Sequence, residues 1–128
     1  DEDNLFKSWQ LQIGKKVILM PGRLTFWKGQ EIFLEALNKV NIQLGNETFI
    51  AVILGSDQGR SLYKKKLIRL SEQHRLNNQI IFIDNCKNMP LAYKISDIVI
   101  KLIMLWLIIY PMIIVIKNGI IVFSNRKL

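Results

Sequence analysis

Residues 17–30 contain the residue types that could hold a phosphate group. A short apolar run at residues 17–20 leads into Gly22, Arg23 follows at once, and Lys28 stands where a helix is predicted to begin. A diphosphate needs close approach by the backbone, which glycine permits, together with N–H donors and fixed positive charge. The spacing therefore predicts a diphosphate-binding turn made by Gly22, Arg23 and Lys28.

This segment also admits other interpretations. The phosphate loop of nucleotide hydrolases does not fit, because Lys28 precedes its glycine and no Ser or Thr follows. Arg23 and Lys28 as simple exposed loop charges remain an alternative. Trp27 could stack on a nucleobase, but an apolar residue at the entry of a helix is the favoured interpretation.

The elements that would position this turn alternate between strand and helix. Strands are predicted at residues 16–20, 48–54, 80–83 and 97–100, and helices at residues 4–11, 28–44, 61–75 and 89–95. Strands that are apolar along their whole length, joined by helices, are typical of a parallel sheet covered on both faces. The predicted fold class is therefore α/β, a Rossmann-like parallel sheet with flanking helices. The turns after Met20, Leu54 and Ile83 should share one rim, where such sheets bind ligands.

The apolar spacing also predicts which helix faces are buried. In the second and third helices the residues expected to face the sheet are Ile32, Phe33, Ala36, Leu37, Val40, Leu44, Leu62, Leu67, Ile68 and Leu70. Lys64-Lys65-Lys66 is expected to lie on a solvated helix face.

Length and composition favour one globular domain. The chain has 128 residues, half of them apolar, and a formal net charge of +8. No nucleic-acid partner is expected despite this charge, since no recognition motif accompanies it. Cys86 is the single cysteine, so an internal disulfide and a cysteine-based zinc site are excluded. The acidic start of the sequence lacks the basic region of a secretory signal, which makes the cytoplasm the expected compartment.

Residues 101–116 differ from everything before them. Fifteen residues without a charge separate Lys101 from Lys117, fewer than the roughly twenty that a membrane span requires. The run shows neither helical nor strand periodicity. Peripheral contact with the inner face of a membrane is one interpretation. The favoured one is an aberrant apolar tail, translated from a shifted reading frame and not selected to fold here.

Several motifs in order resemble a known family over residues 10 to 100. They are Gly22-Arg23-Leu24-Thr25-Phe26-Trp27-Lys28-Gly29-Gln30, Leu54-Gly55-Ser56-Asp57-Gln58-Gly59-Arg60, Ile81-Phe82-Ile83-Asp84, Asn88-Met89-Pro90-Leu91-Ala92-Tyr93 and Ser96-Asp97-Ile98-Val99. Together they resemble the donor domain of glycosyltransferase family four, and in particular the sugar transferases of bacterial cell-envelope and lipopolysaccharide synthesis.

The resemblance implies a fold, a substrate and site residues. The family has the GT-B fold, in which two Rossmann-like domains face a cleft and the C-terminal one binds a nucleotide-sugar donor. By resemblance, Gly22, Arg23 and Lys28 hold the donor diphosphate without a metal or other cofactor, and Gly55, Ile83 and Asp84 lie on the nucleobase side. An acid/base pair of Asp57 and Asp84 is rejected, because ordinary turn roles explain both aspartates.

The sequence departs from the family after Ile100. The family continues with a Glu-Pro-x-x-Phe-Gly stretch and a second glutamate that hold the donor's sugar and ribose, and residues 101–116 contain no acid.

The expected organisation is a lead-in segment at 1–15, a partial donor domain at 16–100 and the tail at 101–128. No catalytic residue is assigned. An inactive fragment of a sugar transferase is the favoured interpretation. The alternatives are a non-catalytic nucleotide-binding domain completed by a separate acceptor-binding half, or a protein attached to a membrane through residues 101–116.

Overall fold

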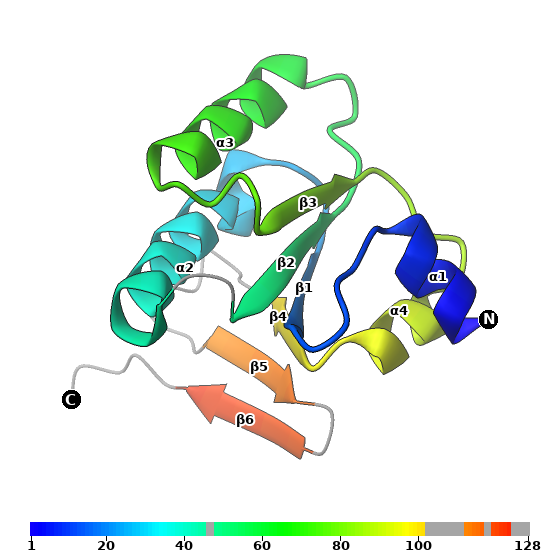
Figure 1. Ribbon diagram of the computed structural model, residues 1–128. Helices are drawn as coiled ribbons and strands as arrows, with labels where there is room; N and C mark the ends of the chain where they lie inside the picture. Colours follow the sequence, from blue (N-terminus) through cyan, green and yellow to red (C-terminus); the bar gives the residue numbers. More distant parts are fainter. Residues whose placement is uncertain (46–47, 102–111, 117–118, 124–128) are drawn as a thin grey trace.

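The computed structural model describes residues 1–45, 48–101, 112–116 and 119–123. The strands are β1 (Lys16–Pro21), β2 (Phe49–Leu54), β3 (Ile80–Ile83), β4 (Ile98–Lys101), β5 (Met112–Ile116) and β6 (Gly119–Phe123). The helices are α1 (Glu2–Ser8), α2 (Gln30–Leu44), α3 (Ser61–Gln73) and α4 (Met89–Ile95), with a 3-10 turn, η1 (Phe26–Lys28), before α2. The strands form one sheet in the order β3-β2-β1-β4-β5-β6 (Figure 1).

The first four strands are parallel. β1 pairs with β2 on one side and with β4 on the other, and β2 pairs with β3. α2 and α3 cover one face of the sheet, and α1 and α4 lie over the other (Figure 1). This arrangement confirms the predicted Rossmann-like α/β fold.

Alternation along β1 explains why both faces need a helical layer. Successive side chains of a strand point to opposite faces. Ile18 and Met20 accordingly belong to the core cluster under α2 and α3, whereas Val17 and Leu19 belong to the cluster under α1 and α4. All four are buried, so neither face of the central strand reaches water.

The helix faces are only partly as predicted. Phe33, Leu37 and Leu67 are buried, but the stripe of α2 that meets the sheet runs through residues 30, 33, 34, 37 and 41. Ile32 and Ala36 lie across the helix from this stripe and are exposed.

The ends of the helices account for further differences. Leu44 is the last residue of α2 and Leu62 lies in the first turn of α3; their exposed fractions are 68% and 79% because no neighbouring element covers them. Ile68 also lies on an exposed face of α3, while Val40 and Leu70 pack at the margin of the core.

The tail contains secondary structure that the sequence analysis did not assign. β5 pairs antiparallel with β4, and β6 pairs antiparallel with β5. Both are short runs rich in isoleucine and valine, residue types that favour strands. Residues 102–111, where membrane contact was an alternative, lie outside the described residues. Within the described ranges, no helix is both long and apolar enough to cross a membrane.

The loops that follow β1 and β2 touch through their backbones. Gly22 N donates to Leu54 O at 2.9 Å, and Gly55 N donates to Ile83 O at 2.8 Å. A Cβ atom on Gly55 would lie 1.8 Å from Gly22 O, a separation that no side chain can occupy. Gly22 itself has φ +146, a conformation that residues other than glycine rarely adopt.

We predict that Gly55→Ala destabilises the protein by at least about 3 kcal/mol, because the added methyl group collides with backbone rather than with a flexible side chain. Urea unfolding followed by circular dichroism measures the change. Gly14→Ala is the control: Gly14 has φ +89 but open space around its Cβ position, so it should lose only about 1–2 kcal/mol. Equal losses for the two variants would contradict the predicted collision.

Candidate functional site

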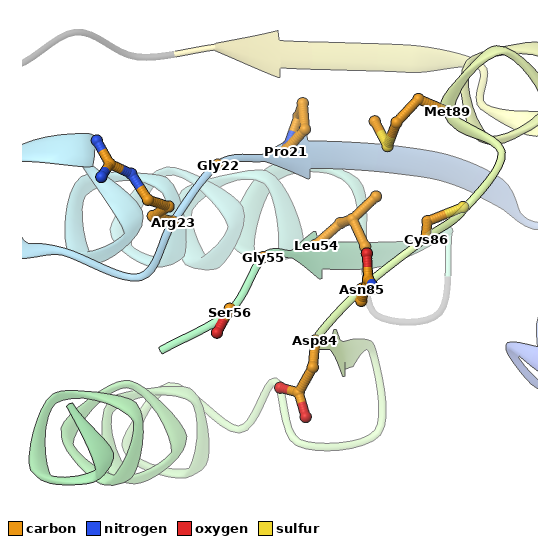
Figure 2. Close-up of a pocket in the computed structure, with 10 residues that line it drawn as sticks. All are labelled: Pro21, Gly22, Arg23, Leu54, Gly55, Ser56, Asp84, Asn85, Cys86 and Met89. Carbon is orange, nitrogen blue, oxygen red and sulfur yellow. The ribbon is translucent and has the colours of Figure 1, made fainter. Parts of the chain in front are cut away.

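A hollow of about 520 Å³ lies at the carboxyl edge of β1, β2 and β3, and we name it the β3-side hollow. The loops after these strands all contribute to it (Figure 2). Its lining residues are Pro21, Gly22, Arg23, Leu54, Gly55, Ser56, Asp84, Asn85, Cys86 and Met89. The three turns therefore share one rim, as the parallel arrangement predicted.

A second hollow, of about 310 Å³, lies on the other side of the end of β1, and we name it the β4-side hollow. Its lining residues are Pro21, Gly22, Arg23, Lys28, Tyr93 and Lys101. The turn at residues 21–23 borders both hollows. A ligand whose phosphates lie on this turn would therefore reach the β3-side hollow with one end and the β4-side hollow with the other.

The structure brings together the three residues predicted to hold a diphosphate. Gly22, Arg23 and Lys28 all line the β4-side hollow. Neither Arg23 nor Lys28 forms an ion pair with an acidic side chain in the part of the chain that is described. In Figure 2 the Arg23 guanidinium extends away from the Asp84 carboxylate. Two uncompensated cations thus lie beside a glycine turn, an arrangement suited to an anionic ligand.

A buried amide holds this turn in place. The side chain of Gln30, at the start of α2, is 1% exposed, and its Nε2 donates to the backbone oxygen of Arg23 at 2.9 Å. Its Oε1 lies 3.5 Å from the Tyr63 hydroxyl of α3, a weak hydrogen bond. Gln30 therefore links the Arg23 backbone to both helices on that face. From the sequence, Gln30 was part of the motif that carries the family resemblance, but no role was assigned to it.

The predicted nucleobase-side residues divide into two groups. Gly55 and Asp84 line the β3-side hollow, but Ile83 does not. Ile83 ends β3, its oxygen accepts from Gly55 N, and its side chain packs beside the core under α1 and α4. The assignment of Ile83 to the nucleobase side, made by resemblance, stays a prediction. Asp84 also forms an ion pair with Lys64 at 2.8 Å, so the lysine run on α3 is not merely solvated.

Two further sequence alternatives can be placed. Trp27 and Phe26 form an edge-to-face pair with centroids 4.8 Å apart on η1, and neither lines the two hollows. Asp57 Oδ1 accepts from Gly59 N at 3.0 Å, which is the turn role expected for it. The described residues include no group of three or more His, Cys, Asp or Glu side chains that could hold a metal ion.

Lys101 and Tyr93 are lining residues that the sequence analysis did not single out. Lys101 ends β4, the parallel neighbour of β1, and Tyr93 lies on α4. The signal for Lys101 was its place at the carboxyl end of a predicted strand. It was overlooked because the long apolar run begins after Ile100, so the predicted domain was taken to end at that residue.

Comparison with known proteins identifies the family. Residues 1–103 match the family described as "Glycosyl transferases group 1", and the chain belongs to that family. No curated protein matches the chain.

Solved structures show the same fold. A glycosyltransferase from Rickettsia africae ESF-5 is 25% identical with a TM-score of 0.73, over 87% of this chain and 27% of that one. The C-terminal domain of the glycosyl transferase group 1 family protein LpcC from Francisella tularensis is 29% identical, with a TM-score of 0.62, over 77% of this chain and 51% of that one.

A third neighbour is Anabaena Alr3699/HepE in complex with UDP and glucose, which is 23% identical with a TM-score of 0.65. The match covers 77% of this chain and 25% of that one. The chain thus spans about a quarter of the Rickettsia and Anabaena proteins.

We predict that Gln30→Met destabilises the protein by about 1–2 kcal/mol, because it fills the same space but leaves the Arg23 carbonyl without its donor. Chemical denaturation measures the loss, and backbone amide shifts at Arg23 and Leu24 report the displaced turn. Gln73→Met makes the same change at an exposed site of α3 and should cost less than about 0.5 kcal/mol. An unshifted turn in the Gln30 variant would show that this hydrogen bond does not hold it.

We also predict a loss of stability in alkali that depends on Tyr63. Burial, together with the nearby Glu31 carboxylate, raises the pKa of Tyr63 from 10.0 to about 12. Between pH 10 and 12 the folded protein keeps this proton while the unfolded chain releases it, so the stabilisation present below pH 10 is lost as pH rises. The free energy of unfolding, measured from pH 8 to 12, should fall less steeply for Tyr63→Phe than for the wild-type protein. Tyr93→Phe, at an exposed site, should follow the wild-type slope.

Proposed function

We propose that this chain binds the diphosphate of a nucleotide-sugar donor at the turn between β1 and η1. The observation that carries the proposal is the position of Arg23 and Lys28, two cations without an acidic partner among the described residues, around the hollow beside Gly22. Membership of the glycosyl transferases group 1 family makes a nucleotide sugar the natural anion for that position.

The chemistry of sugar transfer explains why two such cations are useful. When the bond between a sugar and a nucleoside diphosphate breaks, negative charge increases on the departing diphosphate. Cations already in position stabilise that charge without having to reorganise. Arginine offers a planar fork of donors and lysine a compact charge, so the pair can serve both phosphate groups. In this proposal Arg23 and Lys28 supply the countercharge, and no metal ion is invoked.

The nucleoside is assigned to the β3-side hollow. That hollow shares the turn at residues 21–23 with the β4-side hollow, and Gly55 and Asp84 lie in its lining. Asn85 and the backbone of its loop add groups able to hydrogen-bond a base or a ribose. Because a solved neighbour binds UDP, uridine diphosphate is the first nucleotide to test.

The complete reaction belongs to a larger assembly in this proposal. We assign the chain to the cell-envelope branch of glycosyltransferase family four, with a saccharide or lipid acceptor on the cytoplasmic side of the membrane. An acceptor-binding half must complete the cleft, since the chain spans only part of its structural neighbours. The 128 residues alone should bind nucleotide without transferring sugar. Sugar incorporation by the purified chain would contradict this assignment.

We predict that uridine or guanosine diphosphate binds saturably and shifts the amide resonances of Gly22, Arg23 and Lys28 in an NMR titration. Arg23→Gln and Lys28→Met should each weaken binding about tenfold, since each removes one charge-assisted contact. Lys39→Met, at an exposed site on α2 that lines neither hollow, is the matched control and should leave binding unchanged. Absence of saturable binding, or equal effects of all three variants, would refute the proposed site.

A further inference from the structure

We infer that Lys101 is a third cation of the ligand site and makes it selective for nucleotides that carry a third negative charge at the end of the diphosphate remote from the nucleoside. That charge comes either from the second ionisation of a free terminal phosphate or from the carboxylate of a uronic acid sugar. The inference rests on the proposed function, because it assumes that the diphosphate lies on the turn at residues 21–23.

The composition of the β4-side hollow is the first argument. Of the six described lining residues, three are cationic, Arg23, Lys28 and Lys101, and none is acidic. All three cations lack an ion pair within the described parts of the chain. Tyr93 adds a hydroxyl that can donate a hydrogen bond to an anion.

The balance of charge is the second argument. A nucleotide joined to a neutral sugar carries about two negative charges on its diphosphate, whereas a free terminal phosphate brings the total to nearly three. A carboxylate on the sugar has the same effect. Arg23 and Lys28 already match a neutral-sugar donor, so the charge of Lys101 remains uncompensated unless the ligand supplies a third negative charge.

The position of Lys101 is the third argument. β4 and β2 lie on opposite sides of β1. With the nucleoside in the β3-side hollow, the β4-side hollow receives the terminal phosphate together with any sugar attached to it. Lys101 is the last residue of β4, and its backbone is paired with Ile113 of β5, so its point of attachment is fixed by the sheet. It therefore meets the distal group and not the base.

The test compares three probes by isothermal titration calorimetry with the full chain: uridine diphosphate, uridine diphosphate glucose and uridine diphosphate glucuronic acid. We expect the glucose conjugate to bind about tenfold more weakly than at least one of the other two, a difference of about 1.4 kcal/mol. Lys101→Met should abolish the preference, because it weakens binding of the glucose conjugate less than binding of the preferred probe. Lys101→Glu should reverse the preference, and Lys39→Met should preserve it.

The outcomes distinguish the terminal phosphate from the carboxylate. They also distinguish failure of the role of Lys101 from failure of the proposed diphosphate site. Preference for uridine diphosphate alone identifies the terminal phosphate, and preference for the glucuronic acid conjugate alone identifies the carboxylate. Equal binding of all three probes, or an equal loss for all three in Lys101→Met, would overturn the role of Lys101 while leaving the diphosphate site intact. Failure of every probe to bind would refute the proposed function and this inference together.

Discussion

The contact between the loops after β1 and β2 is the constraint on which the site depends. Gly55 lies so close to the Gly22 carbonyl that no side chain fits between them. Hydrogen bonds from Gly22 N to Leu54 O and from Leu24 N to Ser56 O tie the two loops together at 2.9 and 3.0 Å. The backbone of Arg23 lies between these two bonds. A small residue at position 55 therefore determines where a cation of the neighbouring loop is presented.

Much of the fold followed from local pattern. β3 and α4 have the bounds that their apolar runs and turn residues predicted, and the parallel order followed from continuous apolar strands. The helix faces were harder, because α2 buries two polar residues, Gln30 and Asn41, within its stripe. Asn41 is satisfied by hydrogen bonds with Gln79, 38 positions away, at 2.7 and 3.2 Å. A pairing of that kind depends on tertiary contact, so periodicity cannot reveal it.

The candidate site was likewise only partly predictable from the sequence. The turn at residues 22–28 was predictable because its glycine and cations are adjacent in sequence, and the structure places them around one hollow. Tyr93 and Lys101 reach that hollow from elements far along the chain, so their proximity depends on strand order. Ile83, assigned to the nucleobase side by resemblance, is the last residue of β3, and its backbone oxygen accepts a hydrogen bond from Gly55 N. β5 was overlooked because it lies within the apolar run at residues 101–116, which is longer than a single strand and was assigned as a whole to an aberrant tail.

The order of the strands has an evolutionary consequence. From β1 the chain winds outward through β2 and β3, then returns to the opposite side of β1 with β4. The helix that follows β1 (α2) and the helix that precedes β4 (α4) lie on opposite faces of the sheet. The opening between the carboxyl ends of these two strands is therefore created by the winding direction rather than by any particular side chain. Mutation can exchange the groups around that opening without disturbing the buried layers. Ligand preference is thus free to drift while the scaffold persists, which gives descendants of one ancestor a ready route to new substrates.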